Sequence, residues 1–147
     1  MSYFRRILVA VDASDTSQKA IDLAIHIATD GMTAQVWFCS VVNIDEDYRE
    51  AAAAELGDIA SLIAEDRVEA TRTVADAVQA ALAAGIEATG EVLEGNPAAE
   101  IVKRARDGEF DLIVSGTHGR GGIERLVLGS TAAKILQHAS IPVVVAK

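Results

Sequence analysis

The stretch ILVAVD (Ile7–Asp12) decides the fold, because it is a continuous apolar run that ends in a carboxylate. A run without polar alternation is typical of a strand buried on both faces, as in parallel sheets. Three candidate helix N-caps follow at Ser14, Asp15 and Thr16. Behind them, apolar residues at spacings of three and four predict a helix over Gln18–Thr29. The chain therefore opens with a buried strand that leads into an amphipathic helix.

The rest of the chain repeats this alternation. Further strands are predicted at Val36–Val42, Ile86–Leu93, Leu112–Val114 and Ile141–Ala146, and the second of these alternates like a half-exposed edge strand. Helices are predicted at Ala51–Ala84, as one helix or two broken near Gly57, at Ala98–Ala105 behind the turn Gly95-Asn96-Pro97, and at Thr131–Gln137. The polar segment Asp45–Glu50 is predicted to be a loop. Strands that alternate with helices imply an α/β domain over residues 1–147, with a mostly parallel sheet covered on both faces.

Composition restricts the classes of function. The chain has 147 residues, a formal net charge of −9 and one cysteine, Cys39. A nucleic-acid partner is disfavoured because nonspecific binding to a polyphosphate backbone needs a basic face. No apolar run approaches the roughly 20 residues of a membrane span, and the apolar stretch behind Arg5-Arg6 is too short for a signal peptide. We therefore expect a cytoplasmic protein with neither a nucleic-acid nor a membrane partner.

The loop after the fourth strand is the strongest candidate for binding chemistry. Its glycines follow the pattern G-x2-G-x9-G-S, from Gly116 and Gly119 to Gly129-Ser130. Glycines at a strand end let backbone amides turn toward a ligand, and the first amides of the helix behind Gly129 favour an anion. The alternative is a surface turn followed by an ordinary N-cap. The residues alone leave both readings open.

Two other loops carry weaker candidates. Asp12 is placed to accept hydrogen bonds from a ribose hydroxyl or a base amine, or to cap the following helix. Val41 and Val42 are suited to the wall of a base pocket or to the core. His26 and His138 have no carboxylate or cysteine at ligand spacing, so no protein metal site is predicted.

Together these motifs resemble the universal stress protein family, in its ATP-binding subclass. The resemblance covers nearly the whole chain and is carried by Ile7–Asp12, Gly95–Ala98, Asp111–Val114, the glycine loop and Ile141–Val145. It implies a single universal stress protein domain with a doubly wound, Rossmann-like sheet of five parallel strands in the order 3-2-1-4-5, as in adenine nucleotide α-hydrolases. It also implies that ATP lies between strands 1 and 4, with magnesium or manganese held through the phosphates. A twofold homodimer through strand 141–146 is implied as well.

The resemblance also assigns roles in the binding site. By the resemblance, Asp12 is the acid that contacts adenosine and Val41 is the residue that packs on adenine. The glycine loop and the helix behind it contact the ribose and the phosphates. The site residues expected to bind the nucleotide are Ala10, Val11, Asp12, Val41, Ser115, Gly116, His118, Gly119, Arg120, Gly129, Ser130 and Thr131. Ala13 and Ser40 depart from the family pattern, where glycine and histidine are frequent.

The predicted function is regulation through the nucleotide-bound state, without catalytic residues. Phosphoryl transfer needs a base and a metal carboxylate near the γ-phosphate, and the stretch Gly116–Gly122 contains no acid. The P-loop lysine is missing as well. The alternatives are a weak ATPase or adenylating enzyme of the same fold, and a dimeric scaffold that holds no nucleotide.

Overall fold

The computed structural model describes residues 4–31, 35–117 and 128–147, which form a five-stranded parallel sheet flanked by helices. The strand order is β3-β2-β1-β4-β5, as the family resemblance implies. The strands are β1 (Arg6–Ala10), β2 (Gln35–Asn43), β3 (Ala88–Gly95), β4 (Leu112–Gly116) and β5 (Val143–Ala146). The helices are α1 (Asp15–Gly31), α2 (Glu46–Leu56), α3 (Ile59–Ala83), α4 (Pro97–Asp107) and α5 (Ser130–His138).

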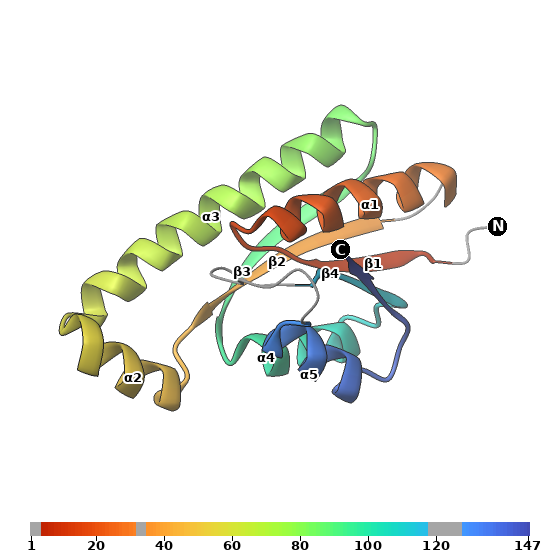
Figure 1. The fold of residues 1–147 in the computed structure, drawn as a ribbon. Coiled ribbons are helices and arrows are strands. Elements are labelled where there is room, and N and C mark those ends of the chain that lie inside the picture. Colours follow the sequence, from red (N-terminus) through yellow and green to blue (C-terminus); the bar gives the residue numbers. More distant parts are fainter. Residues whose placement is uncertain (1–3, 32–34, 118–127) are drawn as a thin grey trace.

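Helices cover both faces of the sheet. Figure 1 shows α1 and α3 on one face, α4 and α5 on the other, and α2 beyond the ends of the strands. Successive residues of β1 point to opposite faces, so Ile7 joins the core under α1 and α3 while Leu8 joins the core under α4 and α5. Both side chains are fully buried. This confirms that the opening run is a strand buried on both faces.

The Ala-rich segment forms two helices rather than one. Gly57 ends α2 with a φ of 74°, a left-handed conformation that glycine adopts without steric cost. Asp58 then caps α3 by accepting a hydrogen bond from the Ser61 N–H at 3.1 Å. Of the two alternatives left open by the sequence, two helices broken near Gly57 is therefore confirmed.

The predicted loop at Asp45–Glu50 is wrong, because α2 begins there. The Asp45 side chain caps this helix, with Oδ1 accepting from the backbone N–H groups of Asp47 at 3.1 Å and Tyr48 at 3.3 Å. The acidic residues of the first turn, Glu46 and Asp47, complement the positive end of the helix dipole. What looks like a polar loop in the sequence is thus the first turn of a helix.

The starts of α2 and α4 are joined by their capping residues, which we call the linked caps, Asp45 and Asn96. The Asn96 Oδ1 accepts from the Ala99 N–H at 3.1 Å, and its Nδ2 donates to Asp45 Oδ2 at 3.2 Å. Pro97 occupies the first turn of α4, where its fixed φ suits the helix. The loops that leave β2 and β3 are therefore held together at the carboxyl ends of these strands.

In the described part of the chain, no helix is both long enough and apolar enough to cross a membrane.

Candidate functional site

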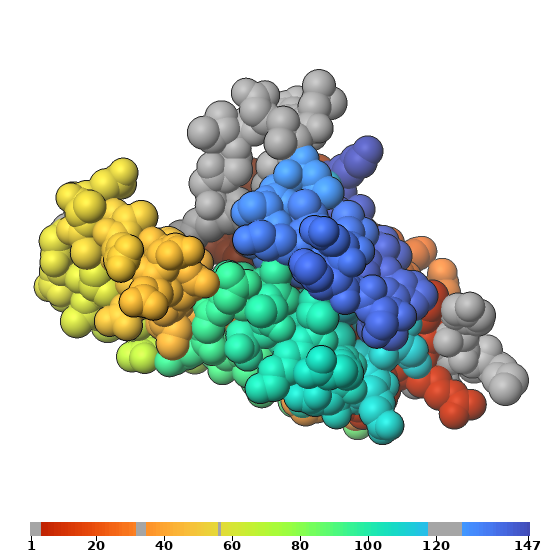
Figure 2. All heavy atoms as spheres, turned by 90° about the horizontal axis from the view of Figure 1, so that it is seen from below, coloured from red at the N-terminus to blue at the C-terminus, as the bar shows by residue number. Residues whose placement is uncertain are grey.

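A cleft of about 700 Å³ opens at the carboxyl ends of the central strands. The strand order reverses there, since β2 and β4 lie on opposite sides of β1. Its volume falls within the roughly 300–1,000 Å³ of small-molecule sites. Figure 2 shows a hollow between the orange atoms of α2 and the blue atoms of α5. All predicted site residues that the structure describes line this cleft: Ala10, Val11, Asp12, Val41, Ser115, Gly116, Gly129, Ser130 and Thr131. His118, Gly119 and Arg120 lie outside the described residues.

The cleft has an apolar end and a polar end. Over β2, its lining is mostly apolar, with one phenol and with Ser40 and Asn43 as the polar residues of the strand; the others are Val41, Val42, Tyr48, Leu62, Pro97 and Ile101. Over β4, it is lined by hydroxyls and glycines: Ser115, Gly116, Gly129, Ser130 and Thr131. Asp12 lies two residues after the end of β1, the strand between these two. The arrangement suits an elongated ligand with an apolar head, a polar middle and an anionic tail.

The polar end is formed by the first turn of α5. Gly129 stands at the N-cap position, where no side chain caps the helix, and the first helical bond runs from the Ala133 N–H to the Gly129 carbonyl at 2.9 Å. The N–H groups of Ser130, Thr131 and Ala132 therefore have no acceptor inside the helix, and all three residues line the cleft. Such a helix start binds anions through its amides and its dipole.

One backbone amide in this region is already in use. The Gly129 N–H donates to the Thr117 carbonyl at 2.7 Å, which ties α5 to the end of β4. In this arrangement the Gly129 amide is not an anion donor, whatever else the residue contributes. The anion-binding capacity of the described polar end thus belongs to residues 130–132.

Gly116 has a structural reason to be glycine. A Cβ at this position would lie 2.5 Å from Thr16 Oγ1 and 2.8 Å from the Thr16 carbonyl carbon. The first turn of α1 therefore packs directly on the end of β4. The residue lines the cleft, but close packing against α1 is enough to explain why it carries no side chain.

Asp12 is not the N-cap of α1, which was the alternative role for this residue. Ser14 caps the helix, since its hydroxyl accepts from the Ser17 N–H at 3.2 Å. Asp12 Oδ1 accepts from the Ser14 N–H at 2.8 Å and so closes the turn before the helix. The second carboxylate oxygen has no hydrogen bond to any residue that the structure describes, and the half-buried side chain lines the cleft.

Carboxylates dominate the charge of the described lining. Asp66 and Glu69 of α3 add to Asp12, and no lysine or arginine is among the described lining residues. Cys39 also lines the cleft, but burial raises the pKa of its thiol to about 12. The thiol is therefore neutral near pH 7, and Cys39 behaves as a small buried hydrophobe. Within the described ranges no group of three or more His, Cys, Asp or Glu residues could hold a metal ion.

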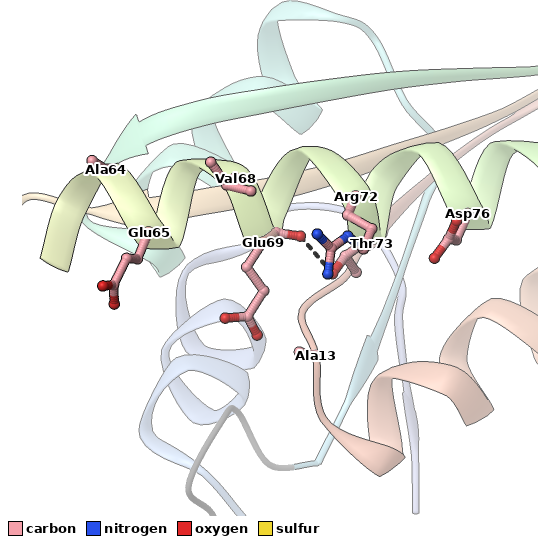
Figure 3. A pocket seen from close by; sticks show the side chains of 8 residues that line it. All are labelled: Ala13, Ala64, Glu65, Val68, Glu69, Arg72, Thr73 and Asp76. Atoms are coloured by element: carbon pink, nitrogen blue, oxygen red, sulfur yellow. Dashed lines mark hydrogen bonds between the residues drawn. The ribbon is translucent and has the colours of Figure 1, made fainter. Parts of the chain in front are cut away.

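A second, more open hollow of about 640 Å³ adjoins the cleft along α3 and shares Ala13, Glu69 and Thr73 with it. Figure 3 shows the carboxylates of Glu65 and Glu69 projecting from the side of α3 that faces Ala13. The Thr73 hydroxyl donates to the Glu69 carbonyl at 2.9 Å. The shared residues make α3 a common wall of the two hollows.

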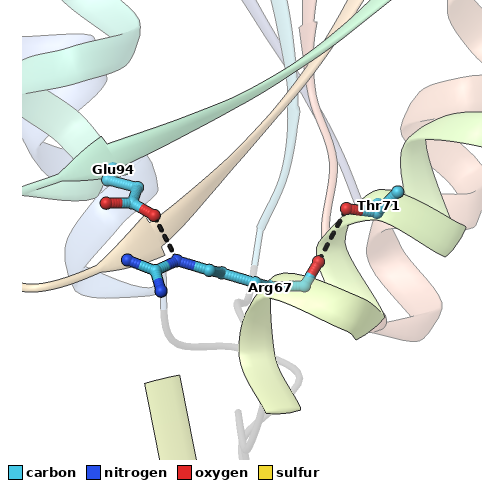
Figure 4. Close-up of polar contacts among 3 residues, drawn as sticks. All are labelled: Arg67, Thr71 and Glu94. Carbon is cyan, nitrogen blue, oxygen red and sulfur yellow. Dashed lines mark hydrogen bonds and ion pairs between the residues drawn. The ribbon is translucent and has the colours of Figure 1, made fainter. Parts of the chain in front are cut away.

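An ion pair fixes α3 to the sheet beside the cleft. Arg67 Nε donates to Glu94 Oε1 at the end of β3, and the Thr71 hydroxyl donates to the Arg67 carbonyl at 2.8 Å (Figure 4). The hydrogen bond from Arg67 lowers the pKa of the Glu94 carboxyl. At the linked caps, the hydrogen bond from Asn96 likewise lowers the pKa of the Asp45 carboxyl. Both contacts hold the α2–α3 segment against β3.

The sequence analysis missed the wall of the cleft that α2 and α3 provide. These residues are Tyr48, Leu62, Asp66, Glu69, Ala70 and Thr73. It also missed Pro97 and Ile101 of α4. The usable signal was Asp45, an N-cap residue followed by an acidic first turn, which places Tyr48 on a helix at the carboxyl end of β2.

The comparisons with known proteins agree with this architecture. A model of the universal stress protein family matches residues 3–147. A universal stress protein of Methanocaldococcus jannaschii is 36% identical over 144 residues, which cover 98% of this chain and 82% of the relative. The structure of the universal stress protein UspA from Lactobacillus plantarum is 28% identical, with a TM-score of 0.84 and all of both chains covered. A structure from Archaeoglobus fulgidus, described in complex with dAMP, is 21% identical, with a TM-score of 0.69 and all of both chains covered. At that identity, the likeness shows the fold alone.

Proposed function

Because the chain belongs to the universal stress protein family, we propose that it is a regulatory protein that binds ATP and acts through its nucleotide-bound state. The observation that carries the proposal is the division of the cleft into an apolar end over β2 and a helix N-terminus over β4. The cleft in this chain offers an environment for each part of such a nucleotide. The Archaeoglobus fulgidus neighbour, described with dAMP, supports an adenine nucleotide as the class of ligand.

The proposed pose follows the gradient along the cleft. The adenine base occupies the apolar end beside Val41, and the ribose lies near the carboxylate of Asp12. The phosphates reach the amides at the start of α5, with the hydroxyls of Ser130 and Thr131 assisting. Magnesium or manganese, when present, is held mainly by phosphate oxygens and water, since the described residues offer no cluster of metal ligands.

The experiment that tests the ligand is direct. The purified protein is denatured, and any released nucleotide is identified by chromatography. Stripped protein is then titrated with ATP, ADP, AMP and cyclic AMP by calorimetry. Tightest binding of ATP supports the proposal, whereas binding of none of the four overturns it. Phosphate release over many turnovers, abolished by a change in the cleft, would instead support the alternative of an ATPase.

We also propose that two copies pair through β5. This strand lies at the edge of the sheet, where the Pro142 carbonyl accepts from the Ile113 N–H and the Ala146 carbonyl accepts from the Thr117 N–H, each at 3.0 Å. By the period of two along a strand, the peptide groups of Val143 and Val145 face away from β4. An apolar edge strand of this kind is a template for another strand, and antiparallel pairing with a second copy would give a twofold dimer.

Three further predictions from the sequence belong to this proposal. The single domain over residues 1–147 and the cytoplasmic location are part of this proposal and rest on the sequence pattern alone. The absence of catalytic residues is likewise a prediction, which the phosphate-release measurement checks.

A further inference from the structure

We propose that Tyr48 is the residue that stacks on the adenine base at the apolar end of the cleft. The inference rests on the proposed nucleotide binding. It adds to that proposal a residue that strengthens the binding of ligands with a base over ligands without one. Neither the sequence pattern nor the family resemblance assigns a role to this position.

Tyr48 lies on the inward face of α2. It is half-buried, whereas its neighbours Asp47 and Arg49 are exposed. Ala52, one turn later on the same face, is buried at 8% exposure. Tyr48 also lines the cleft. The helix therefore turns its phenol toward the cleft while its charged residues face solvent.

The linked caps fix the position of this helix. The Tyr48 N–H donates to Asp45 Oδ1, and Asp45 Oδ2 accepts from the Asn96 amide at the start of α4. The Ile44 N–H adds a bond to the Gly95 carbonyl at the end of β3 at 3.3 Å. The ring is thus carried by a helix start tied to two strand ends, so the backbone that bears it loses little conformational freedom when a ligand meets the ring.

The fold makes little use of the ring itself. Among residues 4–31, 35–117 and 128–147, the Tyr48 hydroxyl forms no hydrogen bond, and the ring takes no part in the aromatic contact between Trp37 and Phe110. No other aromatic side chain is among the described residues that line the cleft. Tyr48 lines the same cleft as Val41 and Pro97, and an aromatic side chain among apolar residues is a surface on which a flat base packs well.

The size of the effect follows from the chemistry of stacking. Stacking of a base on an aromatic side chain tolerates any base but requires a π-face, so an aliphatic residue of similar volume does not replace it. We expect loss of the ring to weaken ATP binding about tenfold, which corresponds to about 1.4 kcal/mol. Ligands without a base should be unaffected.

The test uses the full chain with two replacements of Tyr48 and one control. Tyr48→Phe keeps the ring, and Tyr48→Leu keeps an apolar side chain but removes the π-face. Arg49→Ala, on the exposed side of the same turn, reports any general effect of changing α2. Each variant is titrated with ATP and with inorganic tripolyphosphate by calorimetry. Folding is checked by circular dichroism.

The expected result separates stacking from packing. Tyr48→Phe and Arg49→Ala should bind ATP as the parent does, and Tyr48→Leu should bind it about tenfold more weakly with unchanged tripolyphosphate affinity. A folded Tyr48→Leu protein with parental ATP affinity would overturn the inference and leave the proposed function standing. An equal loss for ATP and tripolyphosphate would also overturn it, because it would indicate a general disturbance of the cleft. A parent protein that binds no adenine nucleotide would instead overturn the proposed function.

Discussion

Replacing Ser130 by proline tests the anion site at one backbone atom. Ser130 is the first residue of α5, where its N–H has no acceptor inside the helix and where proline is favoured. The preceding residue, Gly129, has a φ of −62° and a ψ of 155°, the extended conformation that a residue before proline prefers. Ser130→Pro therefore removes a donor while the helix keeps its start. Ser130→Ala is the matched control, since it removes the hydroxyl and keeps the N–H.

The magnitude follows from a hydrogen bond to a charged group, which contributes roughly 1.5–3 kcal/mol. Loss of the N–H should weaken ATP binding roughly ten- to a hundredfold, because each 1.4 kcal/mol corresponds to about a factor of ten. The hydroxyl assists from an exposed position, so Ser130→Ala should lose only about two- to fivefold. Calorimetric titration at fixed salt measures both constants, and thermal unfolding shows that both variants are folded. If folded Ser130→Pro binds ATP as tightly as Ser130→Ala, the amide of residue 130 is not a phosphate donor.

Three further predictions concern packing, the buried thiol and assembly. Gly116→Ala forces a methyl group against Thr16 and should destabilise the fold by about 1–3 kcal/mol. Urea unfolding followed by the fluorescence emission of Trp37 measures this change, and an unchanged unfolding midpoint would contradict the close packing of Gly116 on Thr16. Cys39 is fully buried, and with a thiol pKa of about 12 only about one molecule in ten thousand carries a thiolate at pH 8. An aromatic disulfide reagent should therefore react with it only after denaturation, and rapid reaction in the native protein would refute the assignment. Light scattering at micromolar concentration should report about twice 15.4 kDa, and Val145→Lys should shift the mass toward one chain. A parent protein that stays monomeric up to about 100 µM, well above an ordinary micromolar Kd, would exclude the β5 dimer.

Much of the fold could be predicted because its central strands are buried on both faces. Such strands appear as uninterrupted apolar runs, so ILVAVD identifies β1 without any tertiary information. The edge position of β3 also followed from its alternating pattern, and its side chains are half-buried along much of its length. The start of α2 was missed because acidic residues fit a loop and a capped first turn equally well. The side chain of Asp45 decides between them, and its bond to Asn96 is a contact between residues far apart in the sequence.

The residues of the candidate site likewise divide into those that the sequence predicts and those that it does not. Residues at the end of a strand or just beyond it, such as Gly116 and Asp12, could be predicted because the carboxyl ends of parallel strands meet at one edge. The pattern around Asp45 indicates that Tyr48 lies on a helix, but it does not place Tyr48 or Leu62 at the cleft. The angle between α2 and α3 at the carboxyl edge of the sheet depends on Gly57 and on long-range contacts such as Arg67 with Glu94. Local spacing carries no information about that angle.

The dipeptide Asn96-Pro97 has a consequence for the chemical ageing of the protein. An asparagine deamidates when the backbone nitrogen of the next residue attacks its side-chain amide, and the proline nitrogen carries no hydrogen with which to complete that step. Conversion to aspartate at this position would place a second carboxylate about 3.2 Å from Asp45 Oδ2, where like charges repel. Pro97 thus protects the Asn96 side-chain amide that joins α2 to α4. During prolonged storage, Asn96 should deamidate more slowly than an asparagine that is followed by a residue with a backbone N–H.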